Sequence, residues 1–63
     1  MNIGRNLTIL LYDKGIKAKE LAKEIGVTPG MISKIKRGER EPSTANLVKI
    51  ADYFGVTVDQ LIK

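Results

Sequence analysis

The sequence predicts an all-α protein that folds as one compact bundle of five helices, a single domain spanning residues 1–63. Three observations carry this prediction. Apolar residues recur along the chain at i, i+3, i+4 and i+7, the spacing of one helix face. Glycine follows four of these segments, and Ser or Thr precedes several of them, as is typical of helix ends. Five such segments in 63 residues leave no room for a sheet.

The first helix is expected from about Asn2 to Lys14, with Gly15 ending it. Its apolar stripe consists of Ile3, Leu7, Leu10 and Leu11. Ile9 and Tyr12 fall off this stripe, on the side that should face solvent. They can either contact a partner subunit or remain singly exposed, as many surface apolar residues do.

The segment from Ala18 to Gly38 predicts two short helices joined by a sharp turn. The first of the two has a narrow apolar stripe made of Ala18, Leu21, Ala22 and Ile25. Gly26 follows the stripe, where a left-handed residue can reverse the chain, and Val27 should pack beneath the bend. The small side chain of Ala22 would let the two helices cross closely.

The second helix of this pair, residues 29–37, is expected to be presented to solvent on one side. Thr28 suits its N-cap, Pro29 its first position, and Gly38 its end. Met31, Ile32 and Ile35 share one apolar arc that should anchor the helix. The opposite side is small, polar and cationic: Gly30, Ser33, Lys34 and Arg37.

Two further helices complete the predicted bundle. One should run from about Thr44 to Phe54, with Ser43 as its N-cap after a polar loop. Its apolar stripe consists of Leu47, Ile50, Ala51 and Phe54, and Gly55 stops it. The last is a short helix, Val58 to Ile62, opened by a capping pair of Thr57 and Gln60 and closing the core with Leu61.

The net charge of +4 is concentrated on one part of the chain. Residues 14–40 hold eight Lys and Arg against three Glu, a local charge of +5, whereas residues 1–13 sum to zero and residues 41–63 to −1. The positive field therefore coincides with the pair of short helices, as expected for a phosphate-binding surface. A solvated, lysine-rich surface would give the same sum.

Composition excludes several classes of function. The chain has no Cys and no His, so disulfides, thiolate zinc sites and imidazole acid-base chemistry are excluded, and we expect no metal, no cofactor and no enzyme activity. No apolar run approaches the roughly 18 residues of a membrane span, and Met1 to Gly4 does not begin a signal peptide with a basic head. The sequence predicts a soluble, cytoplasmic protein.

Several residue types at fixed offsets form a more specific pattern: Leu21-Ala22, Gly26-Val27, Ile32-Ser33, Ile35, Arg37-Gly38 and Pro42-Ser43. This pattern resembles the helix-turn-helix domain of the phage repressor and Cro-type family, also called the Xre family. The resemblance covers the chain from Ile3 to Ile62. It implies a fold of the lambda-repressor-like type, in which the second and third helices form the helix-turn-helix.

The resemblance also implies a function, the sequence-specific binding of double-stranded DNA by a bacterial or phage transcriptional repressor or regulator. The helix 29–37 would enter the major groove. The positions that it would turn toward base edges are Thr28, Pro29, Gly30, Ser33 and Lys34. Only Ser33 and Lys34 have free donor groups, because Thr28 is expected to cap the helix. Gly30 either permits close backbone approach to DNA or is merely tolerated near a helix start.

Phosphate contacts are expected from five cations and from the start of the fourth helix: Lys17, Lys19, Lys36, Arg37, Arg40, Ser43 and Thr44. For each cation the alternative is a solvated side chain.

The chain departs from the family at two places. The family has a Thr or Ser N-cap followed by a DNA-contacting Gln where this chain has Lys17 and Ala18. We therefore expect a lysine to replace a directed hydrogen bond with a point charge. The family also pairs an Arg with a Glu where this chain has Leu11 and Lys36, so an apolar contact with the lysine stem can replace that ion pair.

The expected partner is a DNA site with an inverted repeat, bound by two copies of the chain. Apolar residues near the C-terminus, expected to be exposed, would form the homodimer contact: Val56, Val58 and Ile62. Because the last helix is short, the free domain should be weakly associated or monomeric and pair mainly on DNA. The alternative function is a protein-binding module, such as an antitoxin or adaptor, that uses the same fold.

Overall fold

The five predicted segments all form helices in the computed structural model, which describes residues 1–63. The helices are α1 (Ile3–Lys14), α2 (Ala18–Ile25), α3 (Pro29–Lys36), α4 (Thr44–Phe54) and α5 (Val58–Ile62). There is no strand. The all-α, five-helix prediction is therefore confirmed, with helix ends within a residue of those expected.

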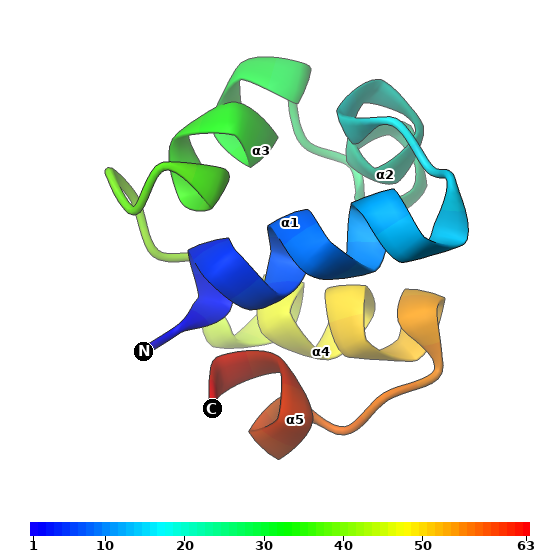
Figure 1. The fold of residues 1–63 in the computed structure, drawn as a ribbon. Helices are drawn as coiled ribbons and strands as arrows, with labels where there is room; N and C mark the ends of the chain where they lie inside the picture. Colours follow the sequence, from blue (N-terminus) through cyan, green and yellow to red (C-terminus); the bar gives the residue numbers. More distant parts are fainter.

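Helix α1 crosses the middle of the molecule, with α2 and α3 on one side of it and α4 and α5 on the other (Figure 1). The thirteen hydrophobic residues of the core come from all five helices, so one apolar centre holds them together. The most deeply buried side chains are Leu7, Leu21, Ile32, Ile35, Ile50 and Leu61. Five of the six belong to predicted apolar stripes or arcs, and Leu61 was predicted to close the core. Burying them supplies the main driving force for folding.

Side-chain caps begin three of the helices as the sequence predicted. The hydroxyl of Thr28 accepts from the Met31 amide at 3.1 Å, and that of Ser43 accepts from the Asn46 amide at 3.1 Å. Thr57 and Gln60 form a reciprocal capping box, with bonds of 3.0 and 2.9 Å. Lys17, at the start of α2, makes no side-chain cap, which confirms the first departure from the family pattern.

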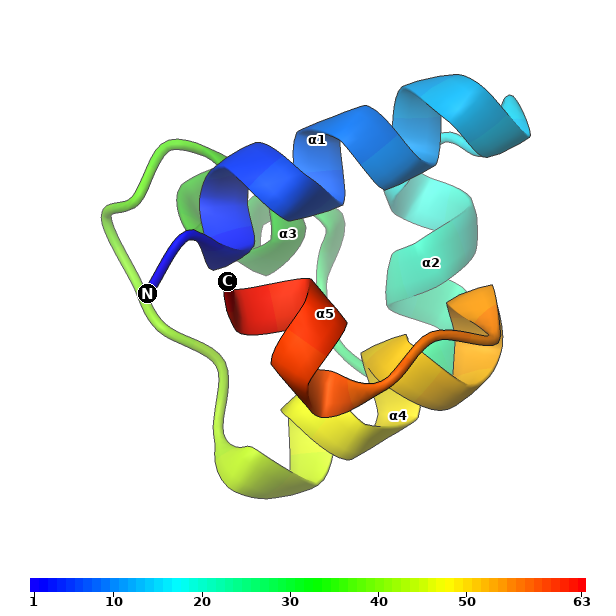
Figure 2. The ribbon, with the colours of Figure 1, turned by 60° about the horizontal axis from the view of Figure 1, so that its bottom comes forward.

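The two ends of the chain are tied together by hydrogen bonds that the sequence analysis did not anticipate. The backbone amide of Asn2 donates to the Ile62 carbonyl at 2.9 Å. The side-chain amide of Asn2 donates to the backbone carbonyl of Lys63, also at 2.9 Å. Asn6, one turn further along α1, donates to the Leu61 carbonyl at 2.7 Å. These bonds satisfy carbonyls at the end of α5, which lies between α1 and α4 (Figure 2).

Helix α1 packs directly against the end of α3 at Gly4, which is buried. A Cβ built on Gly4 would lie 2.7 Å from the carbonyl oxygens of both Ile35 and Lys36. The contact is between two backbones, so neither side can yield by turning a side chain. Glycine here fixes the position of the last turn of α3 relative to the rest of the bundle.

Several expectations about exposure need correction. Leu10 and Met31, predicted on buried faces, are only half-buried. Val56, Val58 and Ile62, predicted to be exposed, are also half-buried and pack against the core. The last helix lies flat against α1 and α4, so its apolar side chains share their surface with the domain itself. Ile9 and Tyr12 are exposed as predicted, to 47% and 86%.

All five helices are too short for a membrane span, and none forms a continuous apolar segment of the required length.

Candidate nucleic-acid interface

Helix α3 is anchored by one face and open on the other. Ile32 and Ile35 are at most 1% exposed and pack on the side of α3 that meets α1 and α2. Lys34 and Gly30 are exposed, and Ser33 is half-buried at the edge of the anchored face. Because the two isoleucines fix the rotation of the helix about its axis, the side chains between them have a defined outward direction. Helices α3 and α2 lie side by side on the same side of α1 (Figure 1).

The predicted base-reading residues are brought together on α3, and they differ in what they can still offer. The Thr28 hydroxyl accepts the Met31 amide, so its acceptor role is taken by the cap, as expected. Gly30 has open space around it, since a methyl group at this position would have the Thr28 hydroxyl oxygen, at 3.9 Å, as its nearest neighbour. Ser33 and Lys34 make no side-chain hydrogen bond within the domain, and Lys34 is the more exposed of the two.

The predicted phosphate-binding residues are all exposed: Lys17, Lys19, Lys36, Arg37, Arg40, Ser43 and Thr44. Six of them lie at helix ends, and Arg40 lies in the loop between α3 and α4. Lys17 and Lys19 are at the start of α2, Lys36 and Arg37 at the end of α3, and the last two at the start of α4. At the start of α4 the Ser43 hydroxyl accepts from the Asn46 amide. The Thr44 amide, like others in a first helical turn, has no intrahelical partner and is available to an anion.

Two of these cations share a shallow groove where α1 ends, α2 begins and α3 ends. The groove is lined by Thr8, Leu11, Tyr12, Gly15, Ile16, Lys17, Ala18 and Lys36. Leu11 and Lys36, the two positions where the family's ion pair is expected, both line this groove. Leu11 is 5% exposed, so the charged partner has been replaced here by a buried apolar one.

An ion pair that the sequence analysis missed joins Arg37 to Glu39. The Arg37 Nε donates to one carboxylate oxygen of Glu39 at 2.5 Å, and a terminal nitrogen donates to the other at 3.4 Å. These hydrogen bonds, and then the attraction of the two charges, lower the pKa of Glu39 and raise that of Arg37. The positive charge of Lys34 further lowers the Glu39 pKa.

The backbone after α3 is what brings Arg37 and Glu39 together. Gly38 has φ +75°, a left-handed conformation, and the Glu39 amide donates back to the Lys34 carbonyl at 2.9 Å. This closing turn folds residues 37–39 over the end of the helix. The signal was present in the sequence as opposite charges flanking a helix-ending glycine, but i and i+2 are not neighbours on a regular helix, so helical spacing alone could not reveal it.

The sequence is similar to a helix-turn-helix family model and to proteins named as transcriptional regulators. A family model described as Helix-turn-helix (HTH_3) matches residues 9–61. An HTH-type transcriptional regulator of Haemophilus influenzae is 43% identical over 51 residues, 81% of this chain and 21% of that protein. The HTH-type regulator YazB of Bacillus subtilis is 31% identical over 58 residues, 92% of this chain and 84% of that protein.

The fold also matches a solved structure. The crystal structure of the clp gene regulator ClgR from Corynebacterium glutamicum superimposes with a TM-score of 0.87 at 32% identity, covering 94% of this chain and 63% of that one. The chain thus spans about a fifth of the Haemophilus regulator and under two thirds of the Corynebacterium chain. The similarity lies in the helical domain itself.

Proposed function

We propose a function from one premise: this chain belongs to the helix-turn-helix family, of the phage repressor and Cro type that its sequence resembles. The relatives compared above are named as HTH-type transcriptional regulators, and neither is named as an enzyme. The function that the geometry supports best is sequence-specific binding of double-stranded DNA, by which the chain regulates transcription in the cytoplasm as a repressor or related regulator. The observation that carries this proposal is the open, donor-bearing face of α3 above a buried isoleucine anchor.

In this mechanism α3 enters the major groove and the surrounding helix ends hold the backbone. Lys34 and Ser33 supply donors toward base edges, while Thr28 serves mainly as the cap that starts the helix. Phosphates are held by Lys17, Lys19, Lys36, Arg37 and Arg40 as charges, and by Ser43 and Thr44 at the start of α4. The exposure of all seven supports this assignment, since none is committed to the core.

A fluorescence titration with a labelled mixed-sequence duplex at several salt concentrations tests the function. Each phosphate contact contributes about −0.9 to the slope of log K against log salt, so five cations give a slope of about −4.5. Affinity should then fall a few hundred-fold between about 50 and 200 mM salt. Binding that is absent, or indifferent to salt, would contradict the proposal and favour the protein-binding alternative, in which apolar docking dominates.

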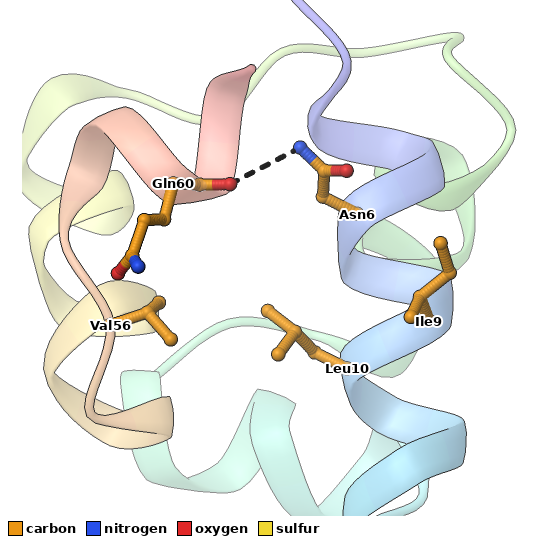
Figure 3. Close-up of a pocket in the computed structure, with 5 residues that line it drawn as sticks. All are labelled: Asn6, Ile9, Leu10, Val56 and Gln60. Atoms are coloured by element: carbon orange, nitrogen blue, oxygen red, sulfur yellow. Dashed lines mark hydrogen bonds between the residues drawn. The ribbon is translucent and has the colours of Figure 1, made fainter.

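We further propose that two copies bind one inverted-repeat site, with their α3 helices about 34 Å apart. The contact would use the outer parts of Val56, Val58 and Ile62 and the adjoining groove between α1 and α5. Figure 3 shows that groove, where Leu10 and Val56 face each other beside Asn6 and Gln60, and Ile9 lies at its margin. Because the three C-terminal residues are half-buried, little apolar surface remains for a partner.

The dimer prediction therefore has two parts. Sedimentation velocity of the free domain should give a monomer at micromolar concentration, and on a duplex selected from a random pool it should give two copies per site. The weak free association follows from the small apolar area, because stable interfaces bury about 800 Å² per partner. A tight dimer without DNA, or selected sites that lack inverted symmetry, would refute this arrangement.

A further inference from the structure

One charged side chain on the proposed DNA face has the wrong sign for its position. Glu39 follows α3 directly, and its carboxylate holds Arg37 through two hydrogen bonds. Arg37 is one of the proposed phosphate ligands. The carboxylate therefore occupies one paired edge of the guanidinium, Nε and a terminal nitrogen, and a phosphate must compete with it for these donors.

The pair is held by backbone geometry and not by burial. The left-handed Gly38 and the bond from the Glu39 amide to the Lys34 carbonyl set the two side chains on the same side of the turn. Both side chains remain about half exposed, at 55% and 53%. An incoming phosphate can thus reach Arg37 from solvent without unfolding any part of the domain.

We propose that Glu39 acts as an internal competitor for DNA phosphate at Arg37, and so sets the overall affinity of the domain without contributing to its sequence preference. On binding, Arg37 exchanges the Glu39 carboxylate for a backbone phosphate, and Glu39 returns to water beside Lys34. This inference rests on the proposed DNA-binding function. The exchange lowers affinity for every duplex by the same factor, because a phosphate contact carries no sequence information.

The variant Glu39→Gln removes the competing charge and keeps the size of the side chain. It should bind two unrelated mixed-sequence duplexes more tightly than the parent chain, by about two- to five-fold on each at low salt, as expected for an exposed ion pair. The gain should shrink as salt rises, because salt screens exposed pairs. Glu41→Gln is the matched control: the same charge is removed two residues away, from an exposed side chain without an ion pair.

A double-mutant cycle with Arg37→Ala separates competition from general repulsion of DNA by a carboxylate. If Glu39 acts through Arg37, the gain from Glu39→Gln should fall in the Arg37→Ala background to the small gain that Glu41→Gln gives. Both positions are exposed, so thermal unfolding should confirm that all variants fold.

Three outcomes would overturn the inference. Glu39→Gln and Glu41→Gln could give equal gains, or the Glu39→Gln gain could persist without Arg37, and either result would reduce Glu39 to a distant negative charge. A loss of affinity on only one of the two duplexes would instead make Glu39 a base-reading residue. In each of these cases the parent chain still binds DNA, so the proposed function stands; a parent chain that binds no duplex would refute both.

Discussion

Gly4→Ala should destabilise the domain by about 1 to 3 kcal/mol, the usual range for forcing an extra methyl into a packed site. The new Cβ would lie 2.7 Å from two backbone carbonyl oxygens at the end of α3, so α1 and α3 must separate. Alanine is the better helix former, but its intrinsic advantage of about 1 kcal/mol only partly offsets the clash. For a domain of this size the melting temperature should fall by about 5 to 20 °C.

Thermal unfolding followed by circular dichroism measures this effect, and Gly30→Ala is its control. A Cβ on Gly30 meets nothing closer than 3.9 Å, so this substitution should leave the melting temperature unchanged or raise it. An unchanged melting temperature for Gly4→Ala would mean that the two helices are not in backbone contact. The DNA affinity of Gly30→Ala then answers a separate question: it should fall if the backbone approaches DNA at Gly30, and stay constant if glycine is merely tolerated there.

Helical spacing was sufficient to predict which faces are buried, because each predicted stripe had to meet the same small core. Leu7, Ile32 and Ile50 illustrate this, since each is fully buried and comes from a different helix. Local cap chemistry was equally readable, as the hydrogen bonds of Thr28 and Ser43 demonstrate. Both kinds of information depend on residues within a few positions of one another.

Contacts between distant parts of the chain could not be read in this way. Gly4 looked like an ordinary residue in a helix, and only its intrinsic penalty in that position hinted at a reason for it. The hydrogen bond from Asn6 to the Leu61 carbonyl joins residues 55 positions apart. The half-burial of Val56 and Val58 depends on how α5 settles between two other helices, which no local pattern specifies.

In the candidate site too, some features follow from local sequence patterns and others depend on the three-dimensional structure. The sequence predicted the open face of α3 and the exposure of its cations, because both follow from helical spacing and charge. It missed the pairing of Arg37 with Glu39, because that contact depends on the left-handed turn at Gly38 and on side-chain directions beyond a regular helix. The structure thus refines the assignment for Arg37, whose charge is already partnered before any DNA arrives.

Lys34→Ala should cause the largest change in sequence preference of any single substitution on α3. Lys34 lies on the second turn of that helix, between the buried Ile32 and Ile35 in sequence and opposite them in direction. Its ammonium is exposed and makes no ion pair, so it can reach the floor of the major groove. Guanine presents its O6 and N7 acceptors there, and lysine can use both.

Loss of this contact should weaken binding to the preferred site by about 1 to 3 kcal/mol and relax the preference at one base pair in each half-site. Arg37→Ala is the comparison, because a phosphate contact should weaken all DNA alike and lower the salt slope by about 1. Arg37→Ala should reduce DNA affinity by less than the loss of an arginine without an ion pair would, because Glu39 already holds the Arg37 guanidinium in the unbound domain.

The measurement is the affinity of both variants for a duplex selected from a random pool and for a scrambled duplex of the same composition. Lys34→Ala should reduce the ratio of the two affinities, and Arg37→Ala should leave that ratio unchanged. Equal losses for both variants on both duplexes would make Lys34 a phosphate ligand. Sequence preference would then have to come from Ser33, Thr28 and the shape of the DNA site, since Gly30 has no side chain with which to read a base.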